Sequence, residues 1–197
     1  KKINFNPQNC FTSCLKRAQN TLSYILDELA IEEKRYINKS WALNERHYGS
    51  LQGLNKDETL NKYGEEQFLK WRRSYDIPPP ELDAASEMNP NNDPKYKELK
   101  GVKLPLSECL KDTYERVIPY WNEAILPSLI KGDTLVVAHG NSLRALCKKL
   151  FNISDYDIVK LEIPTGNPLF LELDNSCKIN SARYLDLSRA EMIPEIK

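Results

Sequence analysis

Residues 133–146 read DTLVVAHGNSLRAL, and this stretch decides the fold class. Residues 135–138 are all apolar, which is typical of a strand buried on both faces of a parallel sheet. The run reaches His139, turns through Gly140 and Asn141, and predicts a short amphipathic helix from Ser142. Together with the elements around it, this stretch predicts an α/β fold with three layers: a mostly parallel central sheet with helices on both faces.

Helical and strand patterns alternate outward from this stretch. Apolar residues at helical spacing predict helices over residues 13–30, 58–75, 106–130 and 141–151, and the sequence SDYD at 154–157 is a capping box that opens another short helix. Short strands are expected within residues 36–43, 169–173 and 180–185. Residues 76–105, rich in Pro, Asn and Asp, predict a long irregular excursion within a single domain spanning 1–197.

The expected helix boundaries depend on a few residues. Ser13, Asp57 and Ser107 are the predicted N-caps of their helices. Gly64 is a weak point in the second helix, and Pro119 is expected to kink the third, because proline lacks the amide N–H.

Composition excludes several classes of protein. Lys+Arg and Asp+Glu number 28 each, and a net charge of zero argues against a general nucleic-acid or membrane-surface binder. The sequence contains no apolar run long enough to span a membrane, and its first residues do not resemble a signal peptide. Five scattered cysteines are expected to be free thiols in a reducing cytoplasm, and no second Cys or His pair completes a metal site with Cys10 and Cys14.

His139 is the first candidate for function. Ligands of open α/β sheets bind beyond the carboxyl ends of the strands, and the N-terminus of the next helix suits a phosphate. We therefore expect His139, with Gly140 and Asn141, at an anion site. The alternative is a histidine that only hydrogen-bonds within its turn.

The second candidate is the run LNERHYGSLQGL at residues 43–54, with the basic residues near it. The cations are Arg17, Arg46, Lys56, Arg72 and Arg73, and guanidinium groups bind phosphate and carboxylate in bidentate fashion. Together they suggest a small, highly charged anion as ligand. Taken singly, Arg17 could be a solvated residue, and Arg72 and Arg73 could simply offset a helix dipole.

Glu45 differs from its neighbours, because a carboxylate among arginines binds no anion. Its expected role is proton transfer to or from a substrate hydroxyl. A structural salt bridge to Arg46 or Arg73 is the alternative.

Five motifs, LNERHYGSLQGLNK, WRRSYDIPPP, ECLKDT, AHGNSLRAL and IPTGNPL, occur in this order. With them the chain resembles the cofactor-dependent phosphoglycerate mutases of the histidine phosphatase superfamily from about Phe11 to Tyr184. The resemblance implies a glycolytic and gluconeogenic isomerase, interconversion of 3- and 2-phosphoglycerate through a phosphohistidine, and 2,3-bisphosphoglycerate as primer without metal. It also implies a cytoplasmic homodimer or homotetramer whose partners are small phosphorylated acids, with no nucleic acid and no membrane.

The resemblance implies roles for individual residues. Glu45 matches the proton donor and acceptor, and His139 matches the histidine that stabilises the transferring phosphoryl group without carrying it. The positions that match substrate-binding ones are Arg17, Arg46, His47, Tyr48, Lys56, Arg72, Arg73, Gly140 and Asn141.

The family's nucleophilic histidine lies in an Arg-His-Gly turn, and these 197 residues contain no such triplet. In addition, the strand at 134–138 should have a paired strand on each side, yet no second strongly apolar strand is evident. We therefore expect the natural protein to include a further strand-turn-helix upstream of Lys1, and this chain alone to be inactive. The alternatives are a bisphosphoglycerate mutase or phosphatase, or a non-catalytic anion-binding relative.

Overall fold

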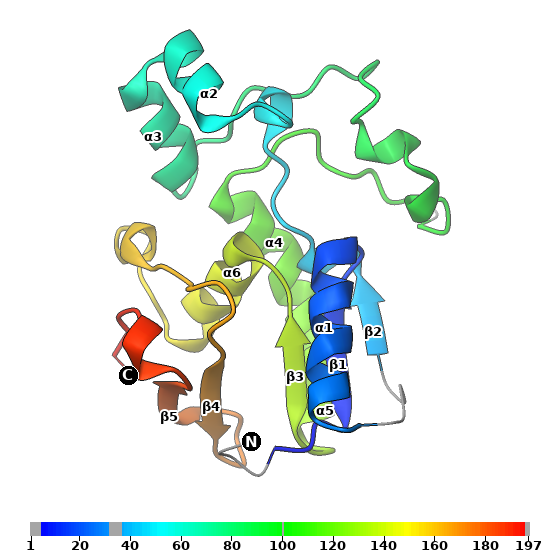
Figure 1. Cartoon of the computed structure of the whole chain (residues 1–197), viewed down its shortest axis with the longest axis vertical. Helices are drawn as coiled ribbons and strands as arrows, with labels where there is room; N and C mark the ends of the chain where they lie inside the picture. Colours follow the sequence, from blue (N-terminus) through cyan, green and yellow to red (C-terminus); the bar gives the residue numbers. More distant parts are fainter. Residues whose placement is uncertain (1–4, 32–36, 100, 196–197) are drawn as a thin grey trace. The chain divides into compact units, whose positions relative to one another are not determined.

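The computed structural model describes residues 5–31, 37–99 and 101–195, which divide between two compact units. Unit 1 comprises Lys1–Glu45 and Tyr114–Lys197, and unit 2 comprises Arg46–Thr113 (Figure 1). The boundary falls inside the run 43–54, between Glu45 and Arg46. The single domain over 1–197 stays a prediction.

Unit 1 is built on a parallel sheet of three strands: β1 (Asn9–Ser13), β2 (Ile37–Ser40) and β3 (Thr134–Val137). The order is β2-β1-β3, so β1 is the central strand. The register pairs Cys10 with both Ile37 and Leu135.

Within the described residues β3 pairs only with β1, and the expected strand on its other side stays a prediction. The expectation that no suitable partner is present was wrong. β1 is polar in sequence but buried from Cys10 to Ser13, because its hydroxyls are hydrogen-bonded: Thr12 Oγ1 donates to the Val137 carbonyl at 2.8 Å. Hydroxyl groups that are hydrogen-bonded can be buried at little cost. The polar sequence of β1 therefore did not indicate that this strand is central.

Helices cover both faces of this sheet, as predicted. Cys10 and Val137 pack with Leu22 and Leu26 of α1 (Lys16–Glu28), which crosses in front of the sheet in Figure 1. Side chains alternate along a strand, so Phe11 faces the opposite side. Its ring meets Tyr120 of α4 (Leu110–Tyr120) edge to face, with centroids 6.2 Å apart. The three-layer α/β class is confirmed.

Two helices of unit 1 begin at other residues than predicted. Leu15, not Ser13, is the N-cap of α1, and Ser13 Oγ accepts from the Leu15 N–H at 3.1 Å. The helix after β3, α6 (Gly140–Leu150), begins two residues before Ser142, directly after His139.

The third predicted helix is divided. Ser107 does not cap it, because its hydroxyl donates to the Pro79 carbonyl at 2.6 Å and α4 starts only at Leu110. Pro119 lies inside α4, and the hydrogen bonding changes to a π-helix at η5 (Trp121–Ile125) before α5 (Leu126–Leu129). Proline cannot donate to the carbonyl four residues back, and such a gap favours a local change of helix type.

The described part of unit 2 includes the short helices α2 (Lys56–Tyr63) and α3 (Glu65–Arg73), separated at Gly64, whose φ is 77°. The weak point at Gly64 is confirmed as a break. Asn55, not Asp57, is the N-cap of α2, and it forms a capping box with Glu58. The irregular excursion is confirmed, and within the described part of unit 2 it contains only the 3-10 turns η3 (Pro90–Asn92) and η4 (Pro94–Tyr96).

The chain ends in an antiparallel hairpin, β4 (Leu169–Leu173) and β5 (Ile179–Tyr184), which forms its own two-stranded sheet. The predicted SDYD helix is a single 3-10 turn, η6 (Asp157–Lys160), and η7 (Leu187–Arg189) follows β5.

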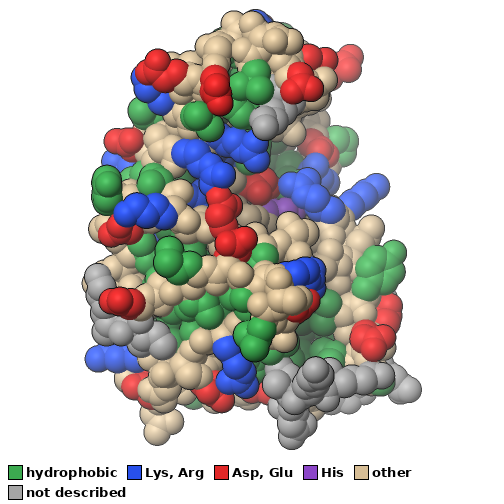
Figure 2. Space-filling model, turned by 60° about the vertical axis from the view of Figure 1, so that its left-hand side comes forward, with side chains coloured by type: hydrophobic (Ala, Val, Ile, Leu, Met, Phe, Trp, Pro, Cys, Tyr) green, Lys and Arg blue, Asp and Glu red, His purple; other side chains and the backbone are tan. Residues whose placement is uncertain are grey.

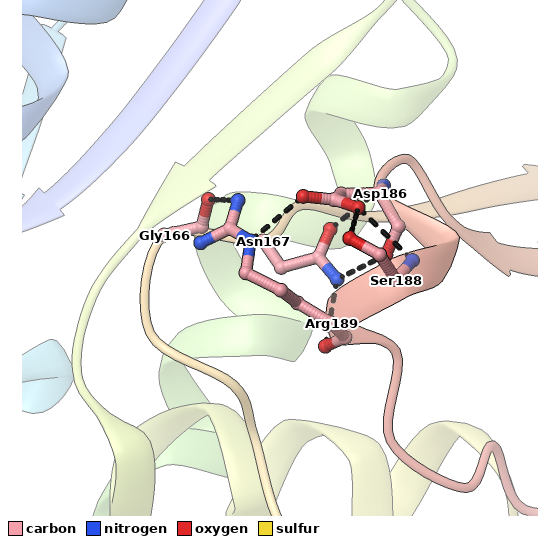
Figure 3. Close-up of polar contacts among 5 residues, drawn as sticks. All are labelled: Gly166, Asn167, Asp186, Ser188 and Arg189. Atoms are coloured by element: carbon pink, nitrogen blue, oxygen red, sulfur yellow. Dashed lines mark hydrogen bonds and ion pairs between the residues drawn. The ribbon is translucent and has the colours of Figure 1, made fainter.

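A polar cluster joins the loop before β4 to η7 (Figure 3). Buried Asn167 donates to the carbonyls of Asp186 and Arg189 at 2.8 and 3.0 Å and accepts from the Asp186 N–H at 3.0 Å. Arg189 Nε bonds Asp186 at 2.7 Å. The side chain of one buried amide thus ties residues of two turns together.

Acidic and basic side chains are interspersed over the face shown in Figure 2, in keeping with the zero net charge. Among the described residues, no helix is both long enough and apolar enough to cross a membrane.

Candidate active site

The carboxyl ends of β1 and β3 bring Ser13 and His139 together. Thr12 pairs with Val137 in the register of these adjacent strands, so the residues that follow emerge at the same edge of the sheet. Ser13 Oγ and His139 Nε2 lie 2.7 Å apart, although 126 positions separate the residues in sequence. The expected placement of His139 beyond a strand end is confirmed.

The hydrogen bonds of His139 define its protonation. Arg17 Nε donates to His139 Nδ1 at 3.2 Å, and a guanidinium can only donate. Burial, reinforced by the positive charges of Arg17 and Arg116, lowers the pKa of His139 to about 4. A neutral ring that accepts at Nδ1 carries its proton on Nε2, so His139 donates to Ser13.

Glu45 lies beside the first turn of α6. A Cβ atom added to Gly140 would come within 3.9 Å of Glu45 Oε2. The His139 backbone N–H donates to Ser142 Oγ at 3.1 Å, which fixes the entry into this helix. A half-buried carboxylate and a neutral histidine therefore lie at the same helix N-terminus.

Arg116 holds the segment that precedes Glu45, although the sequence analysis did not single it out. Its guanidinium donates to the carbonyls of Trp41, Ala42 and Asn44 at 3.3, 2.6 and 3.0 Å, around the turn η1 (Trp41–Leu43). An arginine on the amphipathic helix α4 looks like an ordinary solvated residue. The sequence gives no signal for this role.

Asn141 is the next predicted site residue in unit 1, and it is buried. The buried Arg144 donates to Asn141 Oδ1 at 3.1 Å and to the Ile158 carbonyl at 2.7 Å. One turn of α6 thus orients the amide of Asn141 through a side chain that the sequence analysis also missed.

The remaining predicted residues belong to unit 2. Arg46 is 2% exposed and donates to the carbonyl of Trp71 at 2.9 Å, at the C-terminal end of α3. Its guanidinium carbon also lies 4.7 Å from the centre of the Tyr48 ring. Arg46 therefore has structural contacts in addition to the anion-binding role expected for it.

His47 is held through its backbone. Its N–H donates to Glu108 Oε2 at 2.8 Å, its carbonyl accepts from the Glu108 N–H at 2.9 Å, and its Nδ1 accepts from the Gly49 N–H at 3.1 Å. Burial lowers the pKa of His47, while the charge of Glu108 opposes that change.

Gly49 is required by its surroundings. Its φ is +59°, and a Cβ atom there would lie 2.0 Å from the Pro80 carbonyl oxygen. The next residue, Ser50, donates its N–H to that same oxygen at 2.8 Å. The YGS and IPPP motifs are thus in direct contact within unit 2.

The other predicted cations are less constrained. Arg72 and Arg73 are exposed in the last turn of α3, where positive charge favours the helix dipole. Lys56 opens α2, and its side chain lies outside what the structure describes.

The predicted site residues thus fall into two sets. Unit 1 brings together Arg17, Glu45, His139, Gly140 and Asn141, and unit 2 holds Arg46, His47, Tyr48, Arg72 and Arg73. A hollow of about 270 Å³ between α1 and β2 contains none of them in its lining. In residues 5–31, 37–99 and 101–195, no group of three or more His, Cys, Asp or Glu side chains could hold a metal ion.

Comparison with other proteins identifies the family of the chain. The family model of the histidine phosphatase superfamily (branch 1) matches residues 2–179. A 2,3-bisphosphoglycerate-dependent phosphoglycerate mutase of Hyphomonas neptunium is 53% identical over 94% of this chain and 77% of its own length. The protein of the same name from Maricaulis maris is 50% identical over 99% of this chain and 81% of its own.

Solved structures share the fold at lower identity. A mycobacterial glucosyl-3-phosphoglycerate phosphatase with inorganic phosphate superposes with a TM-score of 0.63 at 18% identity, over 94% of this chain and 78% of its own. The α-ribazole phosphatase of Shigella flexneri superposes with a TM-score of 0.55 at 15% identity, over 91% of this chain and 75% of its own. The family expected from the motifs is confirmed: the chain belongs to the histidine phosphatase superfamily, branch 1.

Proposed function

We propose that this protein is an isomerase that interconverts 3-phosphoglycerate and 2-phosphoglycerate in glycolysis and gluconeogenesis, through a phosphohistidine and with 2,3-bisphosphoglycerate as primer. The observation that carries the proposal is the cluster of Arg17, Glu45 and His139 at the N-terminus of α6. Two relatives at 50–53% identity that bear the name of this activity support it.

The environment of His139 fits a phosphate. The guanidinium groups of Arg17 and Arg116 both disfavour a further positive charge on the ring, so the local potential is positive. The first N–H groups of α6 add the positive end of a helix dipole. The primer would supply a phosphoryl group when bound. Arg17 and Asn141 would hold phosphate oxygens from unit 1, and we assign the same role to Arg46, Tyr48, Lys56, Arg72 and Arg73 by resemblance.

Glu45 is proposed to move the proton. The two phosphoglycerates differ in which hydroxyl carries the phosphoryl group. The free hydroxyl must therefore lose its proton as it attacks the phosphorus of the phosphohistidine, whose N–P bond breaks and returns its electron pair to the imidazole. Glu45 takes that proton. It returns a proton to the substrate oxygen that loses its phosphoryl group when this group is transferred back to the histidine. A carboxylate beside the helix N-terminus that favours phosphate is suited to this task.

His139 is proposed to stabilise the transferring group without bonding covalently to it. Its Nε2–H is directed to Ser13, which leaves Nδ1, now facing Arg17, as the nitrogen that can interact with a bound anion. A preorganised group of this kind typically contributes on the order of 10²–10³ in rate.

The test uses the protein as the cell makes it, with 3-phosphoglycerate as substrate and enolase as the coupling enzyme for 2-phosphoglycerate. We expect isomerisation that depends on 2,3-bisphosphoglycerate and far exceeds release of inorganic phosphate. The His139→Ala variant should turn over more slowly yet still become labelled by 2,3-bisphosphoglycerate. Phosphate release without isomerisation would replace the proposal with a phosphatase, and loss of label with binding intact would make His139 the nucleophile.

A further inference from the structure

Ser13 is a residue that neither the motifs nor the expected N-cap role explains. It is the last residue of β1, it is fully buried, and it does not cap α1. Its hydroxyl oxygen lies between two donors from different directions: His139 Nε2 at 2.7 Å and the Leu15 N–H at 3.1 Å.

We propose that Ser13 is a positioning residue that holds the proton of His139 on Nε2 and thereby presents Nδ1 to the phosphorylated ligand. This inference rests on the proposed function for its consequence in catalysis, but the geometry on which it depends is separate from that function.

The direction of the two bonds follows from the chemistry of the donors. Arg17 Nε and the Leu15 N–H can only donate, so Nδ1 and Ser13 Oγ must both accept from them. A neutral imidazole has one N–H, and with Nδ1 accepting, that N–H is Nε2. Ser13 Oγ has two lone pairs, which accommodate the Leu15 N–H and the His139 N–H together.

The backbone makes this acceptor rigid. Ser13 is paired in register with Ser40 of β2, and the preceding residue, Thr12, is bonded to β3 through both the strand pairing and its side chain. Sites built on strands hold a side chain more exactly than sites built on loops. The Leu15 N–H further fixes the rotamer of Ser13, so the imidazole ring has one preferred orientation.

The consequence appears when an anion arrives. A bound phosphate competes for the guanidinium of Arg17, which then releases Nδ1. If His139 takes up a proton at Nδ1, the ring donates to the ligand there while its Nε2–H stays on Ser13. Without the Ser13 hydroxyl, a neutral ring that Arg17 has released can carry its proton on either nitrogen and can rotate, so a smaller fraction of the ligand-bound protein presents Nδ1 correctly.

Two histidines, His47 and His139, lie within these 197 residues, and variants identify their signals in the protein as the cell makes it. Nitrogen-15 spectra of the imidazole rings distinguish a protonated ring nitrogen from a bare one, and the His139 signals are the ones that a His139→Gln variant loses. At neutral pH, in the protein as the cell makes it and with saturating inorganic phosphate to compete for Arg17, we expect His139 to carry its proton on Nε2, and Ser13→Ala to give a mixture of the two neutral tautomers.

Thr12→Val is the matched control. It removes a fully buried hydroxyl from the adjacent position of the same strand, one that bonds Val137 instead of His139. This variant should leave the His139 tautomer unchanged. Ser13→Thr, which keeps the hydroxyl, should restore the Nε2–H form, and if the added methyl group prevents folding, the comparison of Ser13→Ala with Thr12→Val still decides.

Kinetics give the second readout. Ser13→Ala should lower kcat by about tenfold or more with little change in KM. Thr12→Val should not lower kcat without a matching change in KM. An unaltered Nε2–H tautomer in folded Ser13→Ala would overturn the proposal, whatever the activity. If the tautomer changes but the wild-type protein does not isomerise phosphoglycerate, the proposed function fails and the positioning role of Ser13 stands.

Discussion

The two histidines of the chain lie in different units and are held in different ways. In unit 1, side chains hold the ring of His139, with Ser13 at Nε2 and Arg17 at Nδ1. In unit 2, His47 is held through its own N–H and carbonyl by Glu108, and its ring bonds backbone groups, at Gly49 and at Leu106.

The difference reflects how each unit is built. Parallel strand ends in unit 1 gather side chains from residues 13, 17 and 139 into one cluster. In the described part of unit 2 no strand occurs, and loops are fixed by caps, backbone hydrogen bonds and a required glycine. Chemistry that needs side chains at set distances is therefore expected in unit 1, and binding groups on adaptable segments are expected in unit 2.

The largest effect should come from Glu45, the last residue of unit 1 before the boundary. Glu45→Gln keeps the shape of the side chain and removes its proton acceptor, so kcat should fall by roughly 10²–10⁴ with little change in KM. Steady-state kinetics of the isomerisation measure this. A variant that keeps kcat but loses substrate affinity would make Glu45 a structural partner of an arginine.

The next effect concerns the loop geometry of unit 2. Gly49→Ala should cost about 2–5 kcal/mol, because it combines a left-handed backbone with an atom placed 2.0 Å from the Pro80 oxygen. Gly101→Ala is the control, since Gly101 has φ +77° but nothing within 4 Å of an added Cβ, and should cost only about 1–2 kcal/mol.

Hydrogen exchange resolved by segment, together with urea unfolding, measures both glycine variants. The added exchange in Gly49→Ala should be confined to unit 2. Equal costs for the two glycines would show that the contact with Pro80 does not constrain the loop.

A smaller effect should appear in the pH dependence of stability. The pKa of His139 is about 4 in the folded protein and 6.5 for an unperturbed histidine. Between these values the unfolded chain binds a proton that the native state does not, so stability should fall as pH decreases from 6.5 to 4, by about 3 kcal/mol at most.

Urea unfolding at several pH values measures this loss, and His139→Gln separates it from the titration of carboxylates and of His47. The difference in stability between the wild-type protein and this variant should change across that pH window and be constant above it. A difference that does not vary with pH would mean that His139 titrates normally in the folded state.

The sequence predicted the β3–turn–α6 stretch and its histidine correctly, because an apolar strand that runs into a polar turn and an amphipathic helix has few other structures open to it. The central position of β1 could not be predicted in this way. Ser13 was expected only as a helix N-cap, and the burial of the polar residues Thr12 and Ser13 is explained by their hydrogen bonds to β3 and His139.

The run at residues 43–54 shows a second limit of prediction from the sequence. Its residues are contiguous in sequence, yet Glu45 belongs to unit 1 and Arg46 to unit 2, so their joint action on one ligand stays a prediction. Arg116 and Arg144 show a third. Arg116 donates to the Ala42 carbonyl, 74 positions away in sequence, and Arg144 to the Ile158 carbonyl, 14 positions away, and nothing in the spacing of a helical arginine reveals such partners.

The central claim is that unit 1 holds the phosphate beside His139, and an inorganic phosphate titration followed by nitrogen-15 NMR tests it most directly. Phosphate should bind near Arg17, add negative charge next to the ring, and raise the pKa of His139 above its value in the free protein. The His47 signals should move much less. If phosphate binds, as shown by calorimetry, while the His139 ring does not respond, or if His47 alone responds, the account of this site is contradicted.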